Sequence, residues 1–455
     1  MTRSPFLDLA FSSSLYLALV AGSAGLEPQP PPRIEVPSVP TLSLTLRQAL
    51  EQARAAAPAL ARQRALQSAA EAALRSARDQ RLPQVDLTAG YTRNSNVEEL
   101  TLALPGEELR TIFPNLPNSY RTRAALSLPL YTGGRIEDSI RAADRNLEAA
   151  GKDLEAQTAD LVLETAFAYW DLVTARETER VLRGALESYE AHLVDARNRE
   201  QFGLAARNEV LAVQVEGDRA ELRRLEAENA AAVAHANLVR LLGLPPAARI
   251  EPAEPIAAAI GEPDELEKMV QDALRQRPER AALEARVEAA QAAVGVAGAA
   301  QRPQLGAEAG YDYANPNRKE LPLTGEWKGT WDASVNLAWT VFDSGRTAAE
   351  VDRARAELEA VRQQLVDLDQ RLRLEVTSRF LELGSARQTV EVAERNLAAA
   401  GENRKVAADR YREGVIPSSE LLDAEVALLQ AGLDQTRAWT RLHLAQASLE
   451  RAVGG

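Results

Sequence analysis

Two acidic side chains, Glu420 and Asp423, stand three residues apart near the end of the chain. Within a helix this spacing puts both carboxylates on one face, where they can attract cations. The same residues also fit a plain solvated start of a helix, since carboxylates are favourable near a helix N-terminus. Both interpretations, a cation-attracting site and an ordinary acidic helix start, fit these residues.

The residues that usually carry catalysis or bind metals are scarce. The chain of 455 residues has no cysteine and three histidines, His192, His235 and His443, which lie far apart inside helical pattern. We therefore expect no metal site, no cofactor and no catalytic residue. The G-x-S-x-G, H-E-x-x-H, Walker and Rossmann glycine motifs are absent, so an enzyme is not expected. The net charge of −13 argues against nucleic-acid binding.

The acidic pair follows a turn signal. Gly414 can take the left-handed conformation that ends a helix, and Pro417 prevents one continuous helix. Ser418 or Ser419 can cap the next helix. We expect a tight hairpin between two long helices, either as a working tip of the protein or as an ordinary surface turn of a helical bundle.

The helix pattern is unusually long. It extends over 135–201 and, at 1.5 Å per residue, would reach roughly 100 Å, a length that indicates a coiled coil. A turn at Phe202–Leu204 and a second helical pattern over 206–242 follow. Leucine-type residues recur every seven positions, at Ile140, Leu147, Leu154 and Leu161.

Four segments instead alternate between apolar and polar residues, which predicts strands at 84–92, 122–131, 304–313 and 330–342. Aromatic residues lie near the ends of these strands, as in the interface girdle of a membrane barrel. Alternation alone also fits an amphipathic sheet that packs on a helix. The expected girdle residues are Tyr91, Tyr131, Tyr311, Tyr313, Trp327, Trp331, Trp339 and Phe342.

The second half repeats the first at an offset of 211 residues, without a gap from 131 to 243. Such a repeat defines the architecture. The first repeat covers 42–243, with its hairpin at 135–242. A linker at 244–263 joins it to the second repeat, 264–455, with its hairpin at 346–453.

Only one of the two acidic residues is repeated in the first half of the chain, whereas the heptad pattern is repeated in full. Glu420 has a counterpart in Glu209, whereas Asp423 corresponds to Ala212. The full acidic pair therefore belongs to the second hairpin alone. The copied heptad positions are Val351, Leu358, Leu365 and Leu372.

The first residues predict export. Residues 1–24 form a signal peptide and residues 25–41 a Pro-rich extended segment, and no later run of about 20 apolar residues could span a bilayer as a helix. If the strands cross a membrane, the four strands of one chain are too few to close a barrel. The two edge strands must then pair with strands of other copies. Three copies give twelve strands, within the known range of outer-membrane barrels.

The chain resembles the TolC family of outer-membrane efflux channels over about residues 42–455. The fold class that follows is mostly α with a small β part: duplicated long-helix hairpins form a trimeric α-barrel, and four strands per protomer form a 12-stranded trimeric β-barrel. The resemblance rests on the duplicated plan, on the turns at Gly203 and Gly414, on the junctions Tyr131-Thr-Gly-Gly-Arg135 and Phe342-Asp-Ser-Gly-Arg346, and on Arg410-Tyr411-x-x-Gly414 followed by Glu420-Leu421-Leu422-Asp423-Ala424.

The resemblance implies a homotrimeric passive conduit in the outer membrane, with its helical barrel in the periplasm. Its partners would be outer-membrane lipid, a periplasmic adaptor (membrane fusion) protein, and an inner-membrane efflux pump or ABC exporter. The family's gate residues correspond to Tyr411, Glu420 and Asp423; in a trimer the two acids would give six carboxylates around one axis. The adaptor-docking tips correspond to Phe202, Gly203, Leu204, Ala205, Arg207, Asn208, Gly414, Val415, Ile416, Pro417 and Ser418.

Two departures from the family pattern stand out. Ile416 occupies the position where some members carry an arginine that locks the closed state, and no cysteine follows the signal to carry a lipid. The alternative to an efflux or type I secretion channel is an exported coiled-coil protein without a channel, such as an adhesin or a structural protein. The residues do not identify a cargo, since drugs, metal ions and peptides all leave through conduits of this plan.

Overall fold

The computed structural model describes residues 41–102, 110–257 and 261–455. The expected signal peptide, and the Pro-rich segment up to residue 40, lie outside the described residues. Within the described part, two long helical hairpins and a small antiparallel sheet follow the duplicated order of the sequence. The predicted mostly helical fold, with duplicated long hairpins and four main strands, is confirmed.

The helices of the first half are α1 and α2 before the strands and α3 and α4 after them. Those of the second half are α5 and α6, followed by the hairpin of α7 and α8. Their bounds are α1 Leu46–Ala56, α2 Pro58–Asp79, α3 Arg135–Gln201, α4 Arg207–Leu241, α5 Leu266–Gln276, α6 Pro278–Gly298 with a 3-10 turn at Ala299–Gln301, α7 Arg346–Arg412 and α8 Ser418–Val453.

Both long helices begin in the same way. Gly134 and Gly345 precede α3 and α7 in the left-handed region, with φ of 88° and 86°, which a residue without Cβ adopts at little cost. α3 and α7 each contain 67 residues. The heptad positions in both helices are half-buried or buried, as a packed seam requires.

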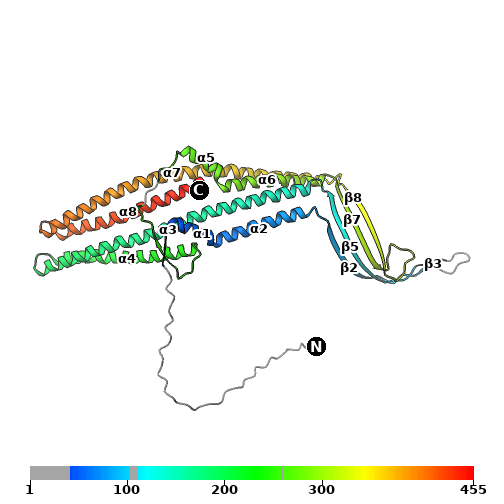
Figure 1. Cartoon of the computed structure of the whole chain (residues 1–455), viewed down its shortest axis with the longest axis horizontal. Coiled ribbons are helices and arrows are strands. Elements are labelled where there is room, and N and C mark those ends of the chain that lie inside the picture. Colours follow the sequence, from blue (N-terminus) through cyan, green and yellow to red (C-terminus); the bar gives the residue numbers. More distant parts are fainter. Residues whose placement is uncertain (1–40, 103–109, 258–260) are drawn as a thin grey trace, which may run out of the picture. The chain divides into compact units, whose positions relative to one another are not determined.

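The helices form a row in two successive stretches. Beside the sheet, α2 packs on α3, and α6 packs between α3 and α7. Toward the turns, α4 packs on α3, α3 on α8, and α8 on α7. The α3–α4 and α7–α8 turns lie together at the end of the helices opposite to the sheet (Figure 1).

The main sheet has the strand order β2-β5-β7-β8, and every neighbouring pair is antiparallel. β8 was expected to continue to Phe342 but ends at Ala338, which pairs with Gln304, the first residue of β7. β5 begins four residues before its expected start. The bounds are β2 Gln84–Arg93, β5 Asn118–Tyr131, β7 Gln304–Asn315 and β8 Lys328–Ala338.

Two small strand pairs lie where the sequence indicated a loop and a linker. β3, Leu100–Leu102, and β4, Arg110–Phe113, extend the connection between β2 and β5 as a hairpin. β6, Arg249–Pro252, pairs in parallel with β1, Thr41–Leu44. The linker between the repeats, 244–263, therefore contains a strand that pairs with the residues at the start of the first repeat.

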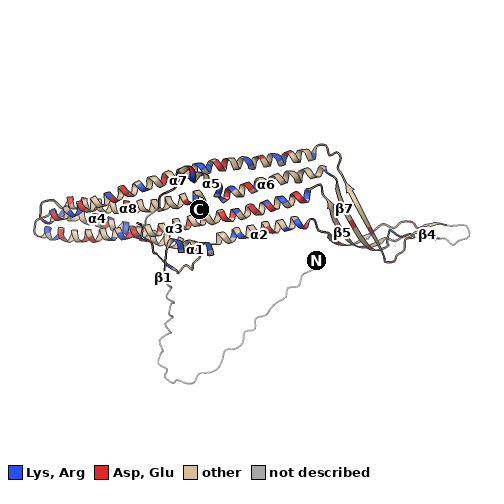
Figure 2. Ribbon diagram, turned by 45° about the horizontal axis from the view of Figure 1, so that its top comes forward, with Lys and Arg blue, Asp and Glu red and all other residues tan. Residues whose placement is uncertain are grey.

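The main sheet has one apolar and one polar face. The apolar face is strongly exposed, with Leu87 75%, Trp331 77% and Leu337 68% accessible. Figure 2 shows charged residues along all the long helices, while the strands carry few of them. An exposed, contiguous apolar surface of this kind is typical of a site that contacts a membrane or another protein.

Among the described residues, no helix is both long enough and apolar enough to cross a membrane.

Candidate functional site

The two hairpin turns have the same backbone geometry. Gly203 and Gly414 adopt left-handed φ values of 71° and 75°. Each turn closes with the same pair of hydrogen bonds, one from the glycine amide and one from the amide after it. These are Gly203 N to Glu200 O at 2.9 Å and Leu204 N to Arg199 O at 2.8 Å, and Gly414 N to Tyr411 O at 3.0 Å and Val415 N to Arg410 O at 2.9 Å.

The start of α8 differs from the prediction that a serine caps it. Pro417 is the N-cap residue and makes no side-chain capping bond, and the helix begins at Ser418. The Ser418 hydroxyl instead lies 2.9 Å from Nε2 of His192 on α3, and Ser418 is 1% exposed. This serine therefore joins the two hairpins, because its hydroxyl is directed to the other repeat.

Tyr411 lies inside the packing of the tip. It is 3% exposed and forms a small core with Ala407, Ile416, Leu421 and Ala424. Burial raises the pKa of Tyr411 above its ordinary value. Ile416, where some relatives were expected to carry a locking arginine, contributes an apolar contact to this core.

Arg199 of α3 supplies a guanidinium at the same place, which the sequence analysis did not identify. Its Nη2 donates to the carbonyl of Tyr411 at 2.7 Å and to that of Arg412 at 3.2 Å. Its Cζ lies 4.2 Å from the centroid of the Tyr411 ring. Arg199 thus neutralises the carbonyl end of α7 and stacks on the tyrosine.

Glu420 and Asp423 lie on the outside of α8. Both side chains are exposed, and neither makes a hydrogen bond or ion pair within the described part of the chain. Their neighbours Leu421, Leu422 and Ala424 are buried. The helix therefore directs its apolar residues into the hairpin and its two carboxylates away from it.

A buried polar network joins α3 to α8 next to the tip. The local sequence pattern did not predict this network. The carboxylate of Glu425 accepts a hydrogen bond from Ser188 Oγ at 2.8 Å and lies 2.9 Å from Nδ1 of His192. Arg404 donates to Ser188 at 2.8 Å and lies 3.7 Å from Glu425. The side chains of His192 and Glu425 are 1% and 4% exposed.

The other two histidines also form specific contacts. His443 stacks on Trp170 with 3.6 Å between ring centroids, and its Nε2 lies 2.7 Å from the carbonyl of Ile256. Burial lowers the pKa of His443. Nε2 of His235 accepts a hydrogen bond from the amide of Ile250 at 3.1 Å. These residues, interpreted from sequence as scattered helix positions, connect the helices to the segment around β6.

The predicted docking residues divide into an exposed group and a buried pair. Phe202 and Leu204 are 77% and 76% exposed, and Val415 is 60% exposed. Ile416 and Ser418 are buried, so these two support the turn from inside. Gly203, Arg207, Asn208, Gly414 and Pro417 are exposed, and Ala205 is half-buried.

The aromatic residues of the sheet form two groups. One group lies at the end of the sheet near the loops. The distances between ring centroids there are 5.1 Å from Tyr91 to Tyr120, 6.0 Å from Tyr120 to Trp327, and 5.0 Å from Trp327 to Tyr313. Tyr120 was missed because the sequence pattern began this strand at residue 122. Tyr311 and Trp331 are opposite each other on β7 and β8. Near the junctions with the helices lie Tyr131, Trp339 and Phe342, all exposed.

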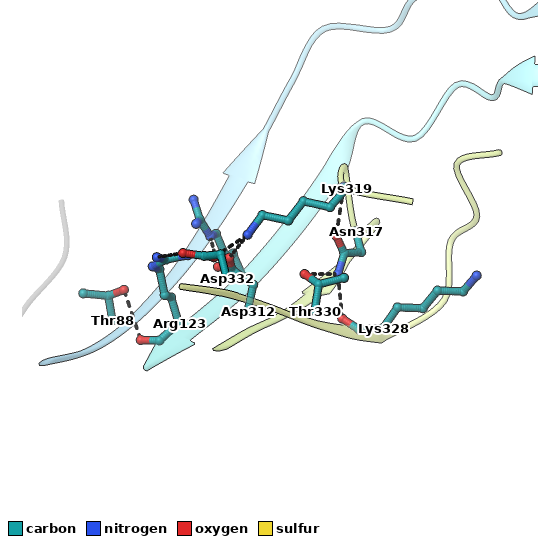
Figure 3. A network of polar contacts seen from close by, with 9 residues as sticks. Thr88, Arg123, Asp312, Asn317, Lys319, Lys328, Thr330 and Asp332 are labelled. Atoms are coloured by element: carbon teal, nitrogen blue, oxygen red, sulfur yellow. Dashed lines mark hydrogen bonds and ion pairs between the residues drawn. The ribbon is translucent and has the colours of Figure 1, made fainter. Parts of the chain in front are cut away.

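The polar face of the sheet carries a charged network near the loop end (Figure 3). Asp312 accepts from Arg121 Nε at 2.7 Å and from Arg123 Nη1 at 2.6 Å, while Asp332 accepts from both terminal nitrogens of Arg123 at 2.9 Å. Lys319, from the loop between β7 and β8, donates to Asp312 at 3.0 Å and to Asp332 at 2.6 Å. The loop is thus tied across the polar face.

Known proteins share both the sequence pattern and the fold. The profile described as "Outer membrane efflux protein" matches residues 49–244 and 269–455. Protein CyaE of Bordetella pertussis is 30% identical to this chain in sequence. The match covers 67% of this chain and 64% of CyaE, slightly less than two thirds of that relative's length. The probable outer membrane lipoprotein SilC of Salmonella typhimurium is 26% identical over 76% of this chain and 72% of its own length.

Among solved structures, the outer membrane channel MtrE of Neisseria gonorrhoeae matches with a TM-score of 0.74. The match covers 92% of this chain and 93% of MtrE at 19% sequence identity, so the likeness shows a shared fold. The family and the fold are those of channel proteins. Because the family profile matches both repeats, this chain belongs to the outer membrane efflux protein family, whose members are located in the outer membrane.

Proposed function

We propose that this protein is the outer-membrane channel of a tripartite efflux system or a type I secretion system. Three copies form a passive conduit, and the energy comes from an inner-membrane pump or ABC exporter that a periplasmic adaptor links to it. The observation that carries the proposal is the two-faced sheet. Its apolar face exposes Leu87, Trp331 and Leu337, and its polar face carries the network around Asp312 and Arg123.

A two-faced sheet of this kind suits a barrel wall, with lipid outside and water inside. Four strands are too few to close, and β2 and β8 end the sheet without a partner strand among the described residues. Pairing of β8 with β2 of another copy would remove both edges. Three copies then give a barrel of twelve strands, with the aromatic residues near its two rims.

The turns at the far end of the helices are the proposed entrance. The exposed apolar residues Phe202, Leu204 and Val415 suit docking of an adaptor, because a few exposed apolar anchors dominate many protein interfaces. Glu420 and Asp423 would line the narrowest point. Their lack of partners within the described chain leaves both carboxylates available to a pore. Six carboxylates around one axis favour cations over anions.

We propose that Tyr411 acts in the gate indirectly. Its ring is buried against α8 and Arg199, which supports a role in packing rather than in lining the pore. We propose that it holds the second hairpin against the first and thereby sets the position of Glu420 and Asp423. Opening would require this packed contact to separate.

Reconstitution into planar bilayers tests the proposal. The purified protein should insert from detergent and produce discrete conductance steps that prefer cations. A variant carrying Glu420→Gln and Asp423→Asn should lose part of this preference, because it removes the charge and keeps the shape. A second variant, Glu413→Gln, alters an exposed glutamate in the same turn and serves as the control. A protein that stays a soluble monomer without detergent would overturn the channel and favour an exported coiled-coil protein.

A further inference from the structure

The helices near the turns alternate between two kinds. The duplication makes α7 the copy of α3 and α8 the copy of α4. In the row α4, α3, α8, α7, the contact between α3 and α8 joins one helix of each kind across the two repeats. The ends of the row, α7 and α4, are the copies of those two helices. A second chain could therefore repeat the α3–α8 contact by placing its α4 against α7.

The exposure of α4 fits such a missing neighbour. Leu422 and Leu433 of α8 are 8% and 7% exposed, because they pack with Leu182 and Tyr189 of α3 and with Val213. Their copies on α4 lie 211 residues earlier. These copies, Leu211 and Leu222, are 50% and 63% exposed. The same positions are covered inside the chain and open at its edge.

The exposure of α7 has the same character. Trp170 of α3 is 3% exposed, since it stacks on His443 of α8. Its copy on α7, Leu381, is 63% exposed. Val392 is 54% exposed, whereas its counterpart Val181 is half-buried against α8. Both edges of the row therefore present apolar residues in the pattern of the internal contact.

The charged contact at the tip has a copy as well. Arg199 donates to the carbonyls of Tyr411 and Arg412 at the end of α7. The offset of 211 takes Arg199 to Arg410. Arg410 is exposed, and its guanidinium makes no hydrogen bond or ion pair with the described residues. The same offset takes the two acceptor residues to Glu200 and Gln201, at the end of α3.

The proposed trimer sets α7 of each copy beside α4 of the next copy. We propose that Arg410 there reaches the last carbonyls of α3 of that next copy. Glu200 of the next copy occupies the repeat position of Tyr411. The contact inside a chain therefore pairs an arginine with an aromatic ring, while the contact between chains pairs Arg410 with a carboxylate. Head-to-tail contacts of this kind give a closed ring when the rotation between copies closes, as it does in the proposed trimer. The inference rests on the proposed trimer and adds the residues that join its subunits at the entrance.

Cysteine cross-linking tests the packing of α7 on α4, because the natural chain contains no cysteine. Inside the chain, the hydroxyls of Thr174 and Thr440 lie 2.5 Å apart. Their copies, Ser385 on α7 and Asn229 on α4, are exposed. The double variant S385C/N229C should give dimers and trimers on a non-reducing denaturing gel after mild oxidation. The control T174C/T440C should cross-link within one chain and migrate as a monomer.

The outcomes separate this inference from the proposed function. If the protein is a trimer in detergent by light scattering and S385C/N229C gives only monomers, the proposed contact is wrong while the channel stands. If no trimer forms, both are wrong.

Charge exchange tests the arginine directly. R410E and E200R should each lower the temperature at which the detergent-solubilised trimer dissociates, and the double variant R410E/E200R should recover most of the loss. A purely local role for Arg410 would leave the double variant at least as unstable as R410E, and that result would overturn the pairing.

Discussion

Glu425 is the residue whose removal should most directly loosen the proposed entrance. It is the centre of the buried network between α3 and α8, with Ser188 at 2.8 Å, His192 at 2.9 Å and Arg404 at 3.7 Å. Glu425→Ala deletes the acceptor and leaves the other three groups without it. The hairpins would then still be joined at the tip by the Ser418–His192 contact, by the contact of Arg199 with Tyr411, and by the apolar packing of Leu422 and Leu433 on α3.

The magnitude follows from burial. Breaking a buried ion pair typically costs roughly 3–5 kcal/mol. The Glu425 side chain is 4% exposed, but Arg404 is 37% exposed, so water screens part of that interaction. We therefore take the lower end, about 3 kcal/mol, which shifts an equilibrium by about a hundredfold. Separation of α8 from α3 at the tip should become more frequent by about that factor.

Single-channel recording measures this shift as the fraction of time spent in the larger conductance state. Glu425→Gln keeps the shape and one acceptor oxygen, so its effect should lie between those of the natural protein and Glu425→Ala. Glu413→Ala removes an exposed glutamate from the same turn and should change nothing. Equal open fractions for Glu425→Ala and Glu413→Ala, with trimers intact, would refute the reasoning that this network holds the entrance closed.

Three further perturbations address other parts of the structure. Ile416→Ala should destabilise the tip by about 2 kcal/mol, since it removes buried apolar volume next to a surface turn, and trypsin should cleave the turn faster than in the exposed control Val415→Ala. Lys319→Ala should free the loop between β7 and β8 from Asp312, so that proteases cut this loop sooner and the conductance rises; an unchanged cleavage rate would contradict the described tie. Burial lowers the pKa of His443, so the folded chain holds the ring neutral, and stability should fall as the pH drops through about 6.5. Between about pH 7.5 and about pH 5.5, the melting temperature of His443→Gln should fall less than that of the natural protein. An equal fall in both proteins would contradict the claim that His443 is neutral in the folded chain.

Local pattern and duplication predicted much of the fold. The sequence expectation for the first long helix, 135–201, corresponds to α3 at Arg135–Gln201, because a glycine in the left-handed region starts this helix and another follows it. The strands were placed less accurately. The end of β8 at Ala338 depends on where β7 begins, which alternation within β8 does not reveal.

The contacts between the hairpins were not predictable from local pattern. Ser418 or Ser419 was expected to cap α8, because serine is a preferred N-cap residue. Ser418 makes a different contact. Its hydroxyl contacts His192, 226 residues away in sequence, and Pro417 takes the N-cap position instead. Arg199 is one of many charged residues on the long helices, and nothing in its local sequence distinguishes it from the others. Only packing of the two repeats against each other gives these side chains their partners.

The roles of the girdle, tip and gate residues remain predictions that rest on assembly. Exposed Glu420 and Asp423, and exposed Trp331 and Leu337, acquire those roles only if three copies enclose a pore in a membrane.

Conductance of the purified natural protein in a planar lipid bilayer tests that central claim most directly. The account predicts discrete steps of uniform size, with a reversal potential in a salt gradient that shows a preference for cations. Bilayers that stay silent at protein concentrations where detergent-solubilised trimers are present would contradict it.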